Sequence, residues 1–279
     1  MNPGSNRHPH SRQEAGSLPA GRRNPDAYDG PDRQLLGQPY FLVADLPSPG
    51  RFVLDGAEGR HAATVRRLRA GETLILTDGR GGQAAAVVTT VGRGELSLTV
   101  AATEQQAPPA VRVILVQAVP KGDRGELAVE LATEAGIDSV VPWAAARCVA
   151  RWKTSEQAAK AVDRWRNTAR EAAKQSRRPY VPEVGDLCST ADVANLLERS
   201  AAGLILHDRA SVPIRAATLP DAGAVVLIVG PEGGLTEEEL TVFRAAGAVP
   251  VRLGSQVLRT STAGAVALGA LGVLTGRWA

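Results

Sequence analysis

The spacing of hydrophobic and polar residues changes along the chain and divides it into two parts. Between residues 39 and 102, short apolar runs alternate with turns containing Gly, Pro or Asp, which is typical of β-strands. We expect strands at 39–46, 51–56, 73–79, 83–92 and 95–102, and a short helix near 59–72. The GRGG stretch at 79–82 predicts a hairpin turn between the third and fourth strands. This set of strands predicts a small barrel.

From Val111 onward, apolar strands alternate with helical patterns. We expect strands at 111–120, 139–144, 203–208, 223–230 and 249–254, and helices at 122–137, 155–178, 189–201, 236–247 and 261–276. Strands that are apolar throughout and alternate with helices predict a parallel sheet covered on both faces, so the fold class is α/β. The expected organisation is a disordered tail over 1–37, a barrel over 38–103, a linker over 104–110 and an α/β domain over 111–279.

Composition excludes several classes of protein. Aromatic residues make up only 4% of the chain, which argues against a surface that reads single strands by stacking bases. Two cysteines, Cys148 and Cys188, exclude a disulfide framework and a cysteine-built zinc site. Two of the four histidines, His8 and His10, lie in the tail, so we expect no metal site. The chain start lacks the apolar segment of a secretory signal, and no membrane span is expected, so we predict a cytoplasmic protein.

Positive charge is concentrated in one segment. From Arg147 to Arg178 the chain carries ten Lys or Arg residues against three Asp or Glu residues. Within it, the 155–178 helix has an apolar stripe of Ala158, Val162, Trp165, Ala169 and Ala172, and a row of basic residues spaced four apart: Arg166, Arg170, Lys174 and Arg178. Such a row is often only a solvated helix face, but the local excess of positive charge favours contact with RNA or DNA phosphates.

Ligands of open parallel sheets bind beyond the carboxyl ends of the strands. We therefore expect the ligand site at the loops after 203–208, 223–230 and 249–254. The second loop, Gly230-Pro231-Glu232-Gly233-Gly234, precedes a helix marked by a capping box of Thr236 and Glu239. It is either a plain tight turn or a place where backbone approaches a ligand. It lacks the P-loop and dinucleotide motifs, and Glu232 would repel a phosphate, so a ligand with hydroxyls, an amine or a cationic centre is favoured.

The third loop ends at Arg259 and is followed by Thr260, Ser261 and Thr262, whose hydroxyls are expected to cap the last helix. Arg259 is either a surface charge or a group that holds phosphate or polarises a base. The small residues of 263–276 suit close packing, for example against a second subunit.

No nucleophilic constellation is visible. The cysteines are expected to be core residues, His61 to be packed or to touch RNA, and His207 to line the ligand site.

Several motifs together resemble one family. IVGPEGGLTEEEL (228–240) and LGSQVLRTSTA (253–263) resemble the signature of SPOUT-class RNA methyltransferases, and more narrowly the RsmE family of 16S rRNA uracil-N3 methyltransferases. Lys121 with LATEAGI (131–137) and Pro142, RWRNTAREAAKQSRRPYVP (164–182) and HAATVRRLRAGE (61–72) are similar to further segments of that family. The resemblance extends from Tyr40 to Leu274.

The resemblance implies a PUA-like RNA-binding barrel, a SPOUT α/β domain with a deep trefoil knot, bound S-adenosylmethionine, a homodimer, and 16S rRNA of the small ribosomal subunit as substrate. The cofactor residues it implies, with their neighbours, are Leu206, His207, Val229, Gly230, Glu232, Gly233, Gly234, Leu253, Gly254, Val257, Leu258, Arg259, Thr262 and Ala263. Arg259 and Glu232 are the catalytic candidates. The expected RNA contacts are Arg66, Arg67, Lys121, Arg147, Arg164, Arg166, Arg170, Lys174, Gln175 and Arg177.

The sequence departs from the family pattern at two positions. Ser261 stands where a Glu is frequent, so a carboxylate at this position is not expected to be an essential base. Leu131 stands where the family has a Lys, so it is assigned no role. Two alternatives remain open at this point. The leading expectation is an S-adenosylmethionine-dependent 16S rRNA uridine N3 methyltransferase. The alternatives to it are a SPOUT enzyme acting on another RNA such as tRNA, and a non-catalytic RNA-binding factor in ribosome assembly. The intact glycine and LGSQVLRT loops favour a retained cofactor site.

Overall fold

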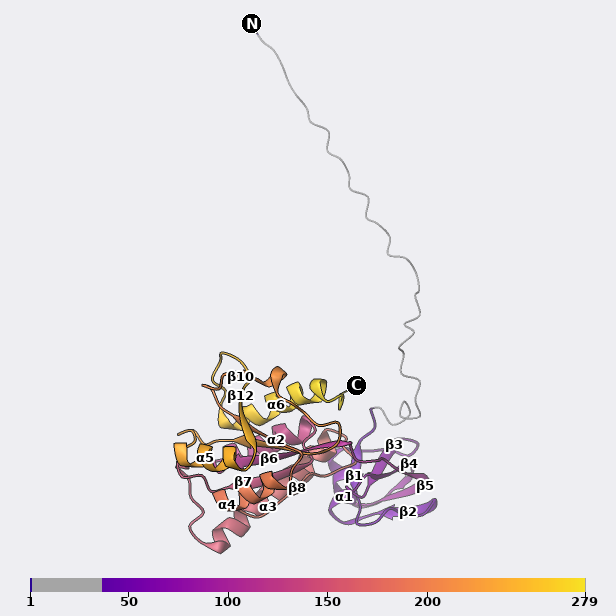
Figure 1. Ribbon diagram of the computed structural model, residues 1–279. Helices are drawn as coiled ribbons and strands as arrows, with labels where there is room; N and C mark the ends of the chain where they lie inside the picture. Colours follow the sequence, from indigo (N-terminus) through magenta and orange to yellow (C-terminus); the bar gives the residue numbers. More distant parts are fainter. Residues whose placement is uncertain (2–36, 279) are drawn as a thin grey trace. The chain divides into compact units, whose positions relative to one another are not determined.

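The computed structural model describes Met1 and residues 37–278. The tail expected over 1–37, with His8 and His10, therefore lies almost entirely outside the described residues. Strands are β1 (Tyr40–Leu42), β2 (Gly50–Leu54), β3 (Thr73–Thr77), β4 (Gly82–Val91), β5 (Leu96–Gln105), β6 (Val111–Ala118), β7 (Ser139–Trp143), β8 (Glu183–Val184), β9 (Ala202–Leu206), β10 (Val212–Pro213), β11 (Gly223–Val229) and β12 (Ala248–Arg252). Helices are α1 (Gly56–Arg60), α2 (Arg124–Glu134), α3 (Ser155–Gln175), α4 (Thr190–Glu198), α5 (Glu237–Ala245) and α6 (Thr260–Leu274) (Figure 1).

The first five strands form one curved sheet in the order β1-β3-β4-β5-β2. The expected hairpin is confirmed, since β3 and β4 pair antiparallel across the 78–81 turn. Alternate side chains of β4 and β5 fill a core with Phe41, Leu74 and Leu76, which are almost completely buried. Two details of the predictions were wrong. Strand β5 continues to Gln105, into the expected linker, and the 59–72 helix is α1 plus a single π-helical turn that ends at Val65.

The second sheet has seven strands in the order β10-β12-β9-β11-β6-β7-β8, and every pair is parallel. The predicted parallel sheet is therefore confirmed. Its register aligns the carboxyl ends of β9, β11 and β12, because Ile228 lies opposite Ile205 and Leu206 lies opposite Val251. The three loops selected from the sequence consequently leave the same edge of the sheet.

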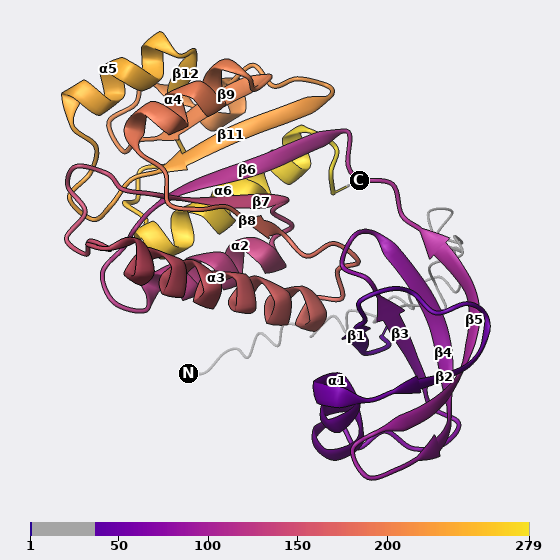
Figure 2. The same ribbon diagram turned by 90° about the horizontal axis from the view of Figure 1, so that it is seen from below.

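Both faces of this sheet are covered by helices, as the apolar strands predicted (Figure 2). Val225, Leu227 and Val229 of β11 point to one face and pack with α2, α3 and α6. Val226 and Ile228 point to the other face and pack with Phe243 of α5 and with α4. Residues that alternate along a strand thus belong to two separate cores, which explains why the strand is apolar at every position.

Candidate functional site

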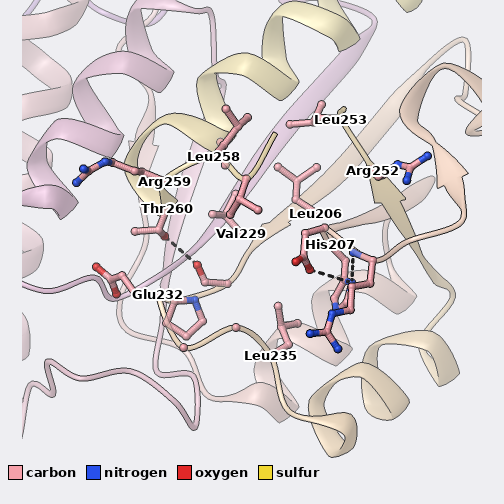
Figure 3. A pocket seen from close by; sticks show the side chains of 18 of the residues that line it. Leu206, His207, Val229, Glu232, Leu235, Arg252, Leu253, Leu258, Arg259 and Thr260 are labelled. Atoms are coloured by element: carbon pink, nitrogen blue, oxygen red, sulfur yellow. Dashed lines mark hydrogen bonds and ion pairs between the residues drawn. The ribbon is translucent and has the colours of Figure 1, made fainter. Parts of the chain in front are cut away.

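A cavity of about 590 Å³ lies at the carboxyl edge of the seven-stranded sheet (Figure 3). The loops after β9, β11 and β12 and the start of α6 form its wall. The side chains of Leu206, Val229, Leu253 and Leu258 give it an apolar interior. Its size lies within the range of small-molecule sites, and apolar walls with a few polar groups are their usual lining.

The three glycines of the 230–234 loop are required for different structural reasons. A Cβ on Gly230 would lie 2.5 Å from Leu235 Cδ1, and a Cβ on Gly233 would lie 3.1 Å from Arg147 Cβ. Gly234 has φ of +70°, a left-handed conformation that side chains disfavour, and nothing lies within 4 Å of its Cβ position. The loop is therefore a closely packed turn whose Gly234 borders the open cavity.

Two side chains lock this loop to the neighbouring 144–147 loop. The capping box at α5 is confirmed, with the Thr236 hydroxyl accepting from the Glu239 N–H and Glu239 accepting from the Thr236 N–H. The other carboxylate oxygen of Glu239, a residue only 4% exposed, accepts from the Ala146 N–H at 2.7 Å. Arg147 donates to the carbonyls of Gly233 and Leu235 at 3.2 and 3.1 Å. The glycine-loop side of the cavity wall is thus held by polar contacts with the 144–147 loop.

Thr260 closes the base of the cavity and was missed as a site residue. Its hydroxyl donates to the Gly230 carbonyl at 2.8 Å and accepts from the side-chain amide of Gln117 at 2.9 Å. The expectation that Thr260 and Ser261 cap α6 was wrong, because Arg259 is the N-cap residue and no side chain caps the helix. Both hydroxyl residues are buried, so Thr260 instead joins α6 to the end of β11.

The two catalytic candidates lie on the same side of the cavity (Figure 3). Glu232 Oε1 lies 3.6 Å from the Arg124 guanidinium and accepts from the Lys121 N–H at 3.3 Å. This carboxylate therefore connects the glycine loop to the start of α2. Arg259 is exposed, and its guanidinium has no hydrogen-bond or ion-pair partner among the described residues. Arg259 is thus available to a ligand, whereas Glu232 is already engaged.

The opposite side of the cavity carries His207 and Arg252 (Figure 3), and Asp208 and Arg209, which follow His207 in the chain, also line the cavity. His207 Nδ1 accepts from the Arg209 N–H at 3.1 Å and lies 3.7 Å from Asp208 Oδ1. The Nδ1 atom of His207 is thus engaged by groups of its own loop.

Of the fourteen expected cofactor residues, all but Thr262 line this cavity. Thr262 faces elsewhere and donates to the Arg259 carbonyl within the first turn of α6. The cavity is also lined by residues that were not predicted for it: Arg124, Arg147, Asp208, Arg209, Pro231, Leu235, Glu237, Val251, Arg252, Gln256 and Thr260. Most of these belong to the same three loops as the predicted residues. Arg124 and Arg147 come from distant segments that only the fold brings near.

The expected RNA-contacting residues fall into three groups. Arg66, Arg67, Arg170, Gln175 and Arg177 are exposed, with no side-chain hydrogen bond or ion pair to another described residue, and the Lys121 side chain is exposed as well. Arg147, Arg164 and Arg166 are exposed but already bind other residues of the chain. Arg147 donates to a backbone carbonyl, and Arg164 and Arg166 form ion pairs with Glu126 and Asp186, each at 3.0 Å. Lys174 is only 11% exposed and pairs with Glu58 and Glu171, so its place in an outward basic row was wrong.

Arg178, the fourth member of that row, also points inward. It donates to the carbonyls of Thr133 and Ile137 at 2.8 and 2.6 Å, and burial lowers its pKa to about 10. The spacing of four predicts a shared helix face only while the helix continues, and α3 ends at Gln175.

Cys148 and His61 pack against other parts of the protein and do not line the cavity. Cys148 is buried, and burial raises the pKa of its thiol, so it is protonated at neutral pH. His61 lies edge-on to Phe41 with ring centroids 6.1 Å apart. In the part of the chain that the structure describes, no three His, Cys, Asp or Glu side chains converge as a metal site would require. None of the helices in that part has the length and apolar character to cross a bilayer.

Comparison with known proteins agrees with this architecture. The family model described as RNA methyltransferase domain matches residues 107–272, and the model described as RNA methyltransferase PUA domain matches residues 54–101. The ribosomal RNA small subunit methyltransferase E of Mycobacterium tuberculosis is 51% identical over 243 residues, which cover 85% of this chain and 92% of that protein. The Bacillus subtilis protein of the same name is 29% identical, over 85% of this chain and 97% of its own.

Solved structures give the same result. A methyltransferase from Legionella pneumophila, determined with bound S-adenosylmethionine, superposes with a TM-score of 0.75 at 28% identity, over 85% of this chain and 97% of that one. The ribosomal RNA small subunit methyltransferase E of Neisseria gonorrhoeae, bound to S-adenosylmethionine, gives a TM-score of 0.74 at 28% identity, over 85% and 98% of the two chains. The chain is an α/β SPOUT protein with an N-terminal PUA-like domain, and it belongs to the ribosomal RNA small subunit methyltransferase E family.

Proposed function

We propose that this protein methylates N3 of a specific uridine in 16S rRNA of the small ribosomal subunit, with S-adenosylmethionine as methyl donor. The observation that carries the proposal is the single cavity formed by the 206–209, 229–237 and 251–260 segments, in a chain 51% identical to a ribosomal RNA small subunit methyltransferase E. Its volume of about 590 Å³ suits a molecule of the cofactor's size.

The residues present fit this cofactor. Leu206, Val229, Leu253 and Leu258 offer apolar surface to an adenine ring, and the 230–234 turn offers backbone groups that approach closely because it lacks side chains at three positions. When bound, the sulfonium supplies an activated methyl group. We assign the lining residues named from the sequence, Thr262 excepted, and Thr260 to cofactor binding.

The chain's own contribution to the reaction is mainly positioning. Methylation forms an N3–CH3 bond while the S–CH3 bond breaks, and the N3 proton leaves to solvent. Holding the uracil in line with the methyl group supplies a large share of the rate enhancement. Arg259, whose guanidinium is free at the cavity, stabilises negative charge that develops on the uracil oxygens. Glu232 holds the glycine loop through Arg124 and orients the cofactor, rather than serving as the base.

Several further properties belong to the same proposal. The α/β domain contains the trefoil knot of this class, in which the Thr260–Gly230 hydrogen bond joins α6 to the end of β11. The protein is a homodimer, and the exposed Val266, Val273, Leu274 and Trp278 at α6 supply apolar surface for the second copy. It acts in the cytoplasm, where small subunits are assembled, and its PUA-like domain binds the RNA.

The proposal is tested by the nucleoside profile of 16S rRNA from cells lacking the gene. We expect 3-methyluridine to disappear from 16S rRNA and to return when the wild-type gene is restored. Loss of a methylated nucleoside from tRNA instead would identify a SPOUT enzyme with another substrate. An unchanged profile of all RNAs would favour a non-catalytic assembly factor.

A further inference from the structure

Lys174 joins the two domains of the chain. It lies in the last turn of α3, and its Nζ is 2.8 Å from Glu58 Oε1 in α1 of the PUA-like domain. The same Nζ is 2.8 Å from Glu171 Oε1, one turn earlier in α3. The side chains of Lys174 and Glu58 are only 11% and 21% exposed, whereas Glu171 is 65% exposed. The cross-domain pair is therefore shielded from solvent.

The charges of this pair depend on each other. Burial by itself lowers the pKa of Lys174, but the hydrogen bonds with Glu171 and Glu58 prevail and raise it above its ordinary value. Glu58 Oε2 is buried and has no hydrogen-bond partner among the described residues. Removing Lys174 would leave the partly buried Glu58 carboxylate without its ion-pair partner, which costs more than losing an exposed ion pair. Removing Glu58 would leave Lys174 paired only with the exposed Glu171.

A second attachment fixes the same two domains at a different place. The 179–181 segment pairs with the β3–β4 turn, where Gly81 donates to the Pro179 carbonyl and Val181 donates to the Gly79 carbonyl, both at 2.9 Å. The Tyr180 hydroxyl donates to the Gln106 carbonyl at 2.7 Å. The domains are also joined by the 106–110 chain segment and by the packing of α3 against β1. The Lys174–Glu58 pair adds a charged contact between them, away from the 179–181 segment.

Exposed arginines lie close in sequence to both members of the pair. Arg66 and Arg67 directly follow the 61–65 turn that continues α1. Arg170 precedes Lys174 by one helical turn, and Arg177 follows three residues after it. The Lys174–Glu58 ion pair thus connects the two segments that carry these two pairs of arginines.

We propose that Lys174 and Glu58 are a positioning pair that holds the arginines of the PUA-like domain and of α3 in register for one continuous stretch of RNA. The inference rests on the proposed RNA substrate. Two binding elements held at a fixed spacing act as one site, and loosening the spacing lowers the effective concentration of the second element. Neither member of the pair touches the RNA.

Charge reversal and charge exchange distinguish this role from direct phosphate binding. In methyl transfer to isolated small subunits, Lys174→Glu and Glu58→Lys should each raise KM for the subunit on the order of tenfold, with kcat little changed. The exchanged variant carrying both substitutions should recover most of the wild-type KM. S-adenosylmethionine affinity by calorimetry should stay at the wild-type value in all three, which also shows that they fold.

Two controls make the result specific. Lys160→Glu changes an exposed pair with Glu156 on the same helix, whose side chains are 70% and 76% exposed, and should leave KM unchanged. Spin labels at Val53 and Val242, both exposed, report the position of the domains without any RNA. In a background with Cys148→Ala and Cys188→Ala, the distance distribution should broaden in Lys174→Glu and narrow again in the exchanged variant.

The two proposals fail differently. If Glu58→Lys tightens RNA binding and the exchanged variant remains as weak as Lys174→Glu, Lys174 binds phosphate and the positioning role is wrong. An unchanged distance distribution in both single variants would also overturn it. If the wild-type protein methylates no site in 16S rRNA, the proposed function fails, while the spin-label experiment still decides whether the pair sets the domain arrangement.

Discussion

The Thr260 hydroxyl donates a hydrogen bond to the Gly230 carbonyl at 2.8 Å, across thirty residues of sequence. Gly230 begins the glycine loop at the end of β11, and Thr260 is the first residue of α6. The same hydroxyl accepts from Gln117, a fully buried residue of β6. One side chain thus joins three segments of the α/β domain at the base of the cavity, so the shape of the cavity depends on it.

Replacing Thr260 by Val should remove the hydrogen bonds of this junction while keeping nearly the same side-chain volume. The Gly230 carbonyl and the Gln117 amide both lose a partner, and a buried polar group without its hydrogen bond costs about 1–3 kcal/mol. We expect denaturant unfolding to show that loss and calorimetry to show weaker S-adenosylmethionine binding. Thr260→Ser keeps the hydroxyl and should bind the cofactor nearly as the wild type does. Equal affinity in the Val variant would show that the junction does not shape the site.

Gly234→Val should abolish cofactor binding for a reason that can be separated from backbone strain. Gly234 has φ of +70° and borders the cavity, so the new side chain fills space meant for the ligand. The left-handed conformation itself should cost about 1–2 kcal/mol of stability. Gly247→Val is the matched control, because Gly247 has φ of +92° and lies outside the cavity lining. Both variants should lose similar stability, but only the first should lose affinity in calorimetry.

Arg259→Ala should lower turnover more than it lowers cofactor affinity. Removing one preorganised donor from a developing negative charge typically costs on the order of a hundredfold in kcat. Arg259→Lys should recover only part of the rate, since Lys lacks the planar guanidinium. Arg244→Ala, an exposed residue at the end of α5, should behave as the wild type does. Wild-type kcat in the Arg259→Ala enzyme would remove the proposed role.

RNA affinity should depend on salt through the exposed arginines. Alanine at Arg66, Arg67 or Arg170 removes one phosphate contact each, which should lower the slope of log affinity against log salt by roughly 0.7–0.9. The measurement is binding of small-subunit RNA at several salt concentrations. Lys160→Ala, whose side chain pairs with Glu156, should keep the wild-type slope. If all three arginine variants keep that slope, the surface that carries them does not contact RNA.

The sequence predicted the parts of the fold that depend on local pattern. The apolar strands 223–229 and 111–118 are buried on both faces, and this is visible in their composition. The start of α5 is also visible in the sequence, because Thr236 and Glu239 have the spacing of a capping box. The three ligand loops were found because parallel strands place their carboxyl ends together.

Contacts between distant segments could not be predicted in this way. Lys174 is spaced four residues from Arg170, as in an exposed basic row, yet its ion pair with Glu58 of α1 leaves its side chain only 11% exposed. Thr260 is a residue type that often caps helices, yet its hydroxyl donates to the carbonyl of Gly230, thirty residues earlier in the chain. In both cases the deciding partner lies far away in sequence, so helical periodicity and local motifs carry no information about it.

Methyl transfer in vitro shows whether the protein modifies N3 of a uridine in 16S rRNA. Purified protein and S-adenosylmethionine are incubated with small ribosomal subunits from a strain lacking the gene, and the RNA is digested and analysed by mass spectrometry. We predict 3-methyluridine at a single position of 16S rRNA with the wild-type protein and none with Gly234→Val. Methylation of tRNA but not of 16S rRNA, or 5-methyluridine as the product, would contradict the proposed function.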